Sequence, residues 1–114
     1  MDRVVCRPAT DALVKGDVFI NDVVFAELAS RYDDVETLEE HILHFGLSVR
    51  RVPRSSLFRA GHAFSHYRKA GGERLNVLAD FLIGAHAAEL TVPLLTRDAK
   101  VYRTYFSDLE LITP

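Results

Sequence analysis

The sequence has few of the features that anchor a chain covalently or in a membrane. Cys6 is the only cysteine among 114 residues, so no disulfide can form within the chain and a reducing cytoplasm is the expected location. No apolar run approaches the length of a membrane span. The first residues include Asp2, Arg3 and Arg7, so we expect no secretory signal. Internal repeats and low-complexity tracts are also lacking.

The composition is typical of a globular protein. Hydrophobic residues make up 48% of the chain and charged residues 26%. A chain of this length folds around one core without a disulfide or a structural metal. The sequence therefore predicts a single domain over residues 1–114.

The net charge of −2 conceals an uneven distribution. Residues 1–47 hold four Lys or Arg and ten Asp or Glu, whereas residues 48–114 hold ten and six. The segment RRVPRSSLFR (50–59) has four arginines and no acid. Such a segment is either a solvated basic face or a surface that binds phosphates.

The front half of the chain predicts helices around one short strand. A helix is expected over 8–15, followed by a strand at 17–20. Asn21 is expected to cap the next helix, because Asn at this position accepts a hydrogen bond from a free backbone N–H. A second, acidic helix is expected over 34–45 and ends at Gly46.

The back half predicts the remaining elements of an α/β domain. In order, these are an extended connector (47–53), a helix (53–70), a buried helix (76–89), a strand (92–96), a short helix (98–105) and a last strand (109–113). The helix over 53–70 places Leu57, Gly61, Phe64 and Tyr67 on one side. Strands that alternate with helices indicate a parallel sheet covered by helices on both faces.

Asp80 lies inside an otherwise apolar helix. The residues around it, 77–85, are apolar on nearly every side, which is typical of a buried helix. A carboxylate in such a place costs several kcal/mol unless it is paired or binds a metal. The alternatives are an ion pair with Arg74 or Arg97 and a functional site.

Two further acids lie near strand ends. Glu27 follows the strand at 17–20, and Asp98 directly follows the strand at 92–96. Ligands of parallel α/β sheets bind outside the carboxyl ends of the strands. As alternatives, Glu27 faces solvent or pairs with Arg31 one helical turn later, and Asp98 caps the next helix.

Glu27, Asp80 and Asp98 together indicate a metal site. Two like charges about 4 Å apart repel by roughly 4 kcal/mol at an effective dielectric constant near 20. A divalent cation removes that cost, and oxygen ligands suit Mg²⁺ or Mn²⁺. These ions activate water and hold phosphodiesters, and the basic back half would hold such a polyanion.

Three segments resemble the PIN domain family, specifically the VapC-type toxin ribonucleases. They are FINDVVFAEL (19–28), LADFLIGAHA (78–87) and LLTRDAKVYRTYFSDLELITP (94–114). The resemblance covers almost the whole chain and implies a three-layer α/β/α domain with a parallel sheet. It also implies metal-dependent RNA cleavage by an acidic quartet, a VapB-type antitoxin as partner, and a homodimer.

The resemblance assigns roles to residues by motif. Glu27, Asp80 and Asp98 match the catalytic, metal-binding acids of the quartet. Near them, Arg97 and Lys100 are expected to contact the phosphates of the RNA. Thr96 is expected to add a polar contact or to cap the following turn.

The first strand of the family pattern is not found in this sequence. PIN domains begin with an apolar strand in the middle of the sheet that ends in Asp. None of Asp2, Asp11 and Asp22 follows such a strand. We therefore expect an N-terminally truncated domain, in which the true start lies upstream of Met1 or a neighbouring chain fills the gap.

Two functions follow from these residues. The first is a metal-dependent endoribonuclease of a type II toxin–antitoxin system that hydrolyses RNA phosphodiester bonds. The alternative is a catalytically inactive PIN domain that binds the antitoxin in a groove lined by Val23, Leu38 and Ile42. His86 is expected to be a packed or capping residue, with a ligand role as the alternative.

Overall fold

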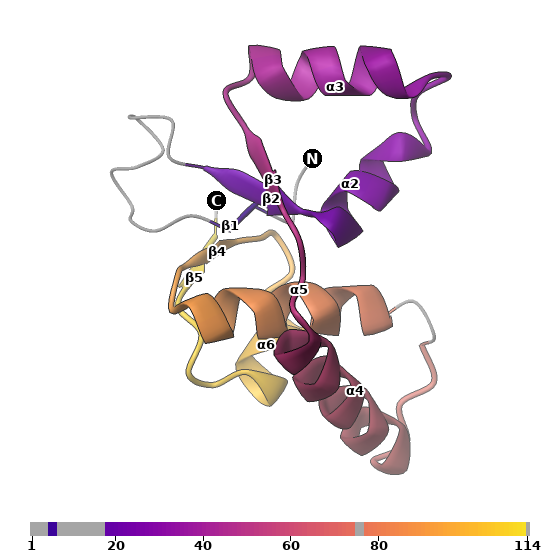
Figure 1. The fold of residues 1–114 in the computed structure, drawn as a ribbon. Coiled ribbons are helices and arrows are strands. Elements are labelled where there is room, and N and C mark those ends of the chain that lie inside the picture. The colour runs from indigo at the N-terminus through magenta and orange to yellow at the C-terminus, as the bar shows by residue number, and fades with distance from the viewer. Residues whose placement is uncertain (1–4, 7–17, 75–76, 114) are drawn as a thin grey trace.

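The protein is described by a computed structural model that covers residues 5–6, 18–74 and 77–113 (Figure 1). The elements are, in chain order, β1 (Val5–Cys6), β2 (Phe19–Asn21), α2 (Asp22–Ala29), α3 (Val35–His44), β3 (Ser48–Arg50), α4 (Arg54–Lys69), α5 (Val77–Leu90), β4 (Leu94–Leu95), α6 (Lys100–Tyr105) and β5 (Leu111–Ile112). The helix predicted over 8–15 and the start of the helix predicted at residue 76 lie outside the described residues.

Local sequence signals set the ends of α2 and α3. Asn21 Oδ1 accepts a hydrogen bond from Val24 N at 3.0 Å, so the predicted cap is confirmed. Asp34 caps α3 in the same way, with Thr37 N donating to its carboxylate at 2.7 Å. This hydrogen bond lowers the pKa of Asp34. Gly46 follows α3 at a φ of +71°, a conformation that favours glycine at a helix end.

The strands form one sheet in the order β3-β2-β1-β4-β5. β2 pairs in parallel with β3, and β4 pairs in parallel with β5. The prediction of an α/β fold with parallel strands is therefore confirmed. The short β1 lies between β2 and β4, in the middle of the sheet, and runs antiparallel to both. No strand was expected at residues 5–6, so the sequence analysis was wrong on this point. Residues 48–50, which were expected to be part of a connector, form an edge strand instead.

The sheet directions define one edge at which a site can form. β2 and β4 both run antiparallel to β1 and therefore run in the same direction as each other. Their carboxyl ends, at Asn21 and Leu95, thus lie at one edge of the sheet. The amino end of β1 lies at the same edge, since Val5 pairs with Leu95.

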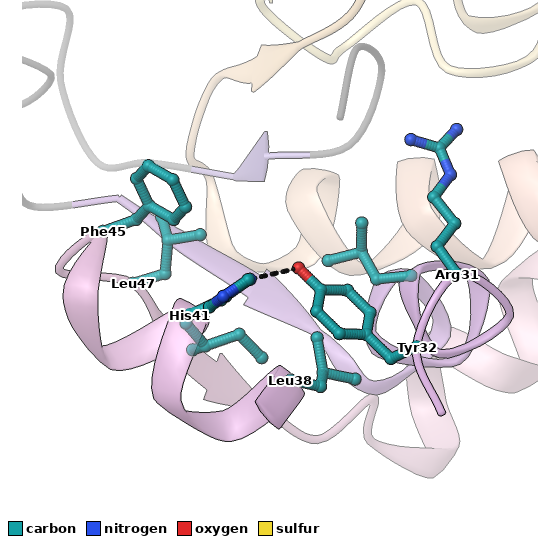
Figure 2. Close-up of a pocket in the computed structure, with 8 residues that line it drawn as sticks. Arg31, Tyr32, Leu38, His41, Phe45 and Leu47 are labelled. Atoms are coloured by element: carbon teal, nitrogen blue, oxygen red, sulfur yellow. Dashed lines mark hydrogen bonds between the residues drawn. The ribbon is translucent and has the colours of Figure 1, made fainter. Parts of the chain in front are cut away.

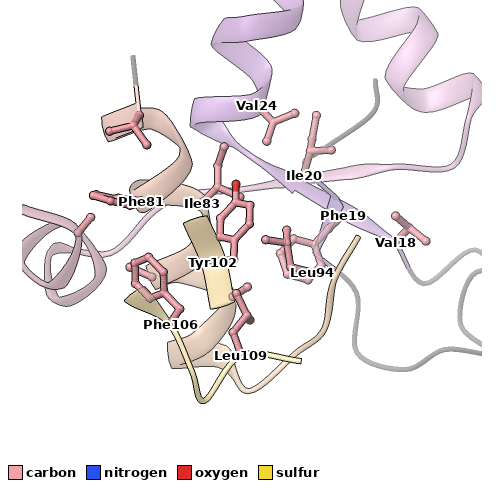
Figure 3. Packing of buried hydrophobic residues seen from close by; sticks show 14 of the residues in the cluster. Val18, Phe19, Ile20, Val24, Phe81, Ile83, Leu94, Tyr102, Phe106 and Leu109 are labelled. Carbon is pink, nitrogen blue, oxygen red and sulfur yellow. The ribbon is translucent and has the colours of Figure 1, made fainter. Parts of the chain in front are cut away.

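The core connects α4, α5 and α6 through aromatic rings. Figure 3 shows Phe81 of α5 near Phe106, which follows α6. The fully buried ring of Phe81 lies 5.2 Å from Tyr105, 5.8 Å from Tyr67 and 5.9 Å from Phe106, measured between ring centroids. These contacts pack α4 and α6 against α5. The other buried hydrophobic residues of the core are Val18, Phe19, Ile20, Val24, Leu38, Ile42, Ala60, Val77, Ile83, Ala85, Ala87, Leu94, Tyr102 and Leu109.

The buried side of α4 is turned relative to the prediction. Phe64 and Tyr67 pack against the core as expected, but Leu57 and Gly61 are exposed. Ser56 and Ala60 are fully buried in their place. Small side chains here allow α4 to approach α5 closely, and they carry little hydrophobic signal in the sequence.

In the part of the chain that the structure describes, no helix combines the length and apolar character needed to cross a membrane.

Candidate functional site

Asp80 is a buried carboxylate. Asp80 is only 2% exposed, and it lies in the first turn of α5 among the buried side chains of Val77, Phe81 and Ile83. The prediction of a buried helix around Asp80 is confirmed by its eight buried residues. A negative charge in the first turn is favoured by the helix dipole, which offsets part of the cost of its burial.

Glu27 lies on the helix that packs against α5. Its side chain is exposed in the second half of α2, and α2 contacts α5, β2 and β3. The cap at Asn21 fixes the first residue of α2. It therefore also fixes the direction in which the helix places Glu27 relative to the sheet edge.

Asp98 lies in the turn between β4 and α6. Thr96, which is fully buried, holds this turn: its Oγ1 accepts a hydrogen bond from Asp98 N at 3.1 Å. Thr96 N also donates to Ile112 O at 3.0 Å, so the turn is tied to β5. Asp98 itself is exposed and does not cap α6, because the cap position is Ala99. The capping alternative for Asp98 is therefore wrong, and the local polar role expected of Thr96 is confirmed.

The two basic residues of the expected site flank Asp98. Arg97 and Lys100 are both exposed, and Lys100 is the first residue of α6. α6 packs against α5, the helix that carries Asp80.

The three acids thus lie on neighbouring parts of the fold, one buried and two exposed. Within the described ranges, no three His, Cys, Asp or Glu side chains come together in a group that could hold a metal ion. The three-carboxylate metal site and its substrate contacts stay predictions from the sequence.

A buried polar pair lies at the end of β2. Asn21 Nδ2 donates to His86 Nδ1 at 3.3 Å, and both residues are buried. The His86 ring also packs edge-on against Phe19, with 6.3 Å between ring centroids. Burial lowers the pKa of His86 below its ordinary value, against the opposing attraction of Asp22. The packed role expected of His86 is confirmed.

The profile of the PIN domain family matches residues 2–107. The chain belongs to the PIN domain family. Proteins of this family are generally nucleases. The resemblance seen in the three sequence segments is therefore confirmed at the level of the family.

The PIN fold is also seen in a solved structure to which this chain is similar. That structure is VapBC2 from Rickettsia felis, bound to a DNA fragment from their promoter. The match has a TM-score of 0.62 and 23% sequence identity, and it covers 83% of this chain and 73% of the other. At this identity the similarity concerns the fold. No curated protein matches the sequence.

A pocket of about 430 Å³ opens between α2 and α3 of this PIN domain (Figure 2). Tyr32 from the end of α2 forms a hydrogen bond of 2.7 Å with His41 Nδ1 on α3, and the two rings meet edge to face. The lining is otherwise mostly apolar and consists of Leu28, Arg31, Leu38, Ile42, Phe45 and Leu47.

A second hollow, of about 730 Å³, lies on the other side of α3. Its lining is Asp22, Phe25, Glu39, Ile42, Leu43, Leu47, Val49 and Arg51. Ile42 and Leu47 line both spaces, so α3 has a pocket on each flank.

The groove expected from helices 22–45 is found in part. Leu38 and Ile42 line the first pocket, whereas Val23 packs against the core. The Tyr32–His41 pair could not be predicted from the sequence, because two residues nine positions apart across a turn follow no helical or strand period.

Proposed function

We propose that this PIN domain is a metal-dependent endoribonuclease of a type II toxin–antitoxin system, which hydrolyses RNA phosphodiester bonds. The observation that carries the proposal is Asp80, a carboxylate 2% exposed within an apolar helix of a chain that matches the PIN family over residues 2–107. Desolvating a carboxylate costs free energy, and buried titratable groups are frequent at functional sites.

The donor atoms suit a hard divalent cation. In the proposal, Asp80, Glu27 and Asp98 hold Mg²⁺ or Mn²⁺ through carboxylate oxygens, which these ions prefer. Glu27 and Asp98 are both exposed, on α2 and in the turn before α6, so their carboxylates are accessible to an ion from solvent. When bound, the ion would supply a water of lowered pKa and charge stabilisation at the phosphate.

The protein's own residues would position the substrate. Arg97 and Lys100 would attract phosphates beside Asp98, since both are exposed cations on either side of it. Thr96 would keep the Asp98 backbone in place through the 3.1 Å hydrogen bond. These contacts orient the phosphodiester, and orientation lowers the barrier to hydrolysis.

The test is a calorimetric titration of Mn²⁺ into the chain and into Asp80→Asn, together with an RNA cleavage assay. We expect saturable Mn²⁺ binding and cleavage by the parent, both lost in Asp80→Asn. Because Asn has nearly the same shape as Asp, the thermal melting temperature should change little. Asp33→Asn, which removes an exposed carboxylate from the turn between α2 and α3, is the matched control and should bind and cleave as the parent does. Undiminished cleavage by Asp80→Asn would remove Asp80 from the mechanism.

We also propose that a VapB-type antitoxin is the partner of this chain. The solved structure with the similar fold is a VapBC2 assembly. In this chain the pocket between α2 and α3 offers apolar side chains with Arg31 at its rim, which suits an amphipathic helix with an acidic residue.

The partner is tested by co-expression of this chain with a VapB-type antitoxin. Phe45, at the edge of the pocket, is 72% exposed, so Phe45→Glu changes the pocket without disturbing the core. We expect Phe45→Glu to lose the partner in co-purification, whereas Leu90→Glu, at the far end of α5, keeps it. Light scattering on the free chain measures whether it is the homodimer that the resemblance implies.

A second candidate function is a catalytically inactive PIN domain that only binds the antitoxin. The observation that favours it is that no three metal-binding side chains gather within the described residues, while α3 has a pocket on each flank. Tight partner binding without Mn²⁺ binding or RNA cleavage would decide for this function.

A further inference from the structure

The longest stretch without a negative charge in the described structure runs through β3 and α4. From residue 41 to residue 72 there is no Asp or Glu, while six residues are Lys or Arg and four are His. α4 itself carries no acid over its sixteen residues. The proposed active site makes no use of this segment.

The exposed residues of α4 fall on one side of the helix. Arg54, Phe58 and His62 are spaced by four, and Ser65 and Lys69 continue the same stripe. All five are exposed, and the stripe lies opposite the buried residues Ser56 and Ala60. We call these five residues the α4 solvent face; at 1.5 Å per residue the helix gives it a length of about 24 Å.

An aromatic ring lies in the middle of the α4 solvent face. Phe58 is 70% exposed, so most of its ring is accessible to a ligand from solvent. The His62 ring contacts it with 4.4 Å between centroids and a tilt of 41°. Cations lie on both sides of this ring pair, Arg54 toward the amino end and Lys69 toward the carboxyl end.

The charges of the α4 solvent face are not neutralised by the protein. Within the described residues, neither Arg54 nor Lys69 forms an ion pair. Arg59 provides the contrast, because it lies at the flank of the face and is bound by both carboxylate oxygens of Asp108, at 2.7 and 3.3 Å. The chain thus pairs one arginine of α4 and leaves the cations of the solvent face available.

We infer that the α4 solvent face binds single-stranded RNA. Cations that follow a line and contact phosphates, with an exposed ring on which a base stacks, are the features of sequence-tolerant single-strand binding. A duplex would leave Phe58 without a base to stack on, since its bases are already stacked. The inference rests on the proposed ribonuclease function, for which it adds a second contact with the same substrate.

The position of α4 fits this role. The ring of Phe81, next to Asp80, contacts Phe64 and Tyr67 near the carboxyl end of α4. The end of α4 that carries Lys69 therefore lies beside the end of α5 that carries Asp80. A strand held along the α4 solvent face would run toward the proposed active site.

The test is fluorescence anisotropy with a labelled oligouridine in EDTA, where metal-dependent cleavage is stopped. We expect Phe58→Ala to weaken binding by about 5- to 100-fold through the lost stacking. Phe45→Ala is the matched control, because it removes an equally exposed ring from the end of α3, and it should bind as the parent does. Arg54→Ala/Lys69→Ala should lower the slope of log affinity against log salt by about 1.4.

Three results would overturn the inference. They are unchanged affinity in both α4 variants, an equal loss in Phe45→Ala, and binding of duplex DNA as tight as that of oligouridine. Light scattering adds a fourth, because a change from dimer to monomer in Phe58→Ala without loss of RNA affinity would make this face a contact between two copies. Asp80→Asn should bind oligouridine in EDTA at least as tightly as the parent, because it removes a negative charge and leaves the α4 solvent face intact. A failure of the proposed catalysis is therefore told apart from a failure of this inference.

Discussion

Helices α3 and α5 are held in the domain in opposite ways. α5 has eight buried residues among fourteen, and α2, α4 and α6 pack around it. α3 has two buried residues among ten, Leu38 and Ile42, and a pocket lies on each of its flanks. In Figure 1, α5 runs through the middle of the ribbon while α3 lies at its edge.

The difference in packing suits α5 and α3 to two different roles. α5 is closely packed, and a helix of this kind can hold a buried carboxylate such as Asp80 in a fixed place. Leu43 and Phe45, on and just after α3, are 80% and 72% exposed, and α3 buries only Leu38 and Ile42. A helix of this kind can change position when a partner fills the spaces beside it.

The largest expected effect is on the stability of the α5 side. Phe81→Ala should lower the free energy of unfolding by about 3–5 kcal/mol, because it empties the centre of the aromatic cluster. Phe45→Ala at the end of α3 should change it by less than about 0.5 kcal/mol, since that ring is mostly in solvent. Urea denaturation measures both, and equal losses would contradict the comparison.

A smaller effect is expected where α6 approaches α5. A Cβ on Gly84 would lie 3.0 Å from ring carbons of both Tyr102 and Phe106, and these two rings are fully buried. Gly84→Ala should therefore cost about 1–3 kcal/mol in spite of the better helix propensity of Ala.

Gly61 on α4 is the matched control for Gly84. No atom lies within 4 Å of a Cβ built on Gly61, and the residue is exposed in the middle of a helix. Gly61→Ala should stabilise the protein by about 1 kcal/mol. Thermal melting of the two variants should move in opposite directions, and a stabilised Gly84→Ala would show that the packing between α5 and α6 is loose.

Local signals in the sequence predicted most of the elements. The caps and the glycine that ends α3 act within a few residues, so they can be recognised without knowing the tertiary structure. β3 was missed because its three residues are all exposed at the sheet edge and show no alternation. β1 was not predicted at all, because it has only two residues and its place in the sheet depends on pairing with residues far apart in the chain.

Within the candidate site, the sequence predicted only those features in which a charged residue lies in a buried, apolar segment. Asp80 stood out because a carboxylate in an apolar helix needs a reason. A packed role was predicted for His86, but its contact with Asn21 was not, since 65 residues separate the pair. The buried side of α4 was predicted wrongly, because the small residues Ser56 and Ala60 take the buried positions that the sequence pattern gives to larger residues.

The pH dependence of stability should follow His86 on α5. Burial lowers its pKa below the ordinary 6.5, so between these two values the unfolded chain binds a proton that the folded chain does not. Its contribution to stability is complete above pH 6.5 and is lost as the pH falls below it, by at most about 1.4 kcal/mol per pH unit.

Urea denaturation across this pH range measures the effect of His86. His86→Gln should flatten the profile, whereas His44→Gln, which removes an exposed imidazole from α3, should leave the slope in place. An unchanged slope in His86→Gln would mean that another group sets it.

The smallest effect is expected at the hydrogen bond that ties α3 to α2. Tyr32→Phe removes the 2.7 Å bond to His41 and should lower stability by about 0.5–1 kcal/mol, because the pair is partly exposed. The sharper measurement is hydrogen exchange, which should become faster in α3 while α5 stays as protected as before. Tyr67→Phe removes a comparable bond, from Arg74 N at 3.1 Å, and should leave exchange in α3 unchanged. If Tyr32→Phe instead raised exchange equally in both helices, α3 would open only with the whole domain, and the pockets beside it would belong to the rigid fold.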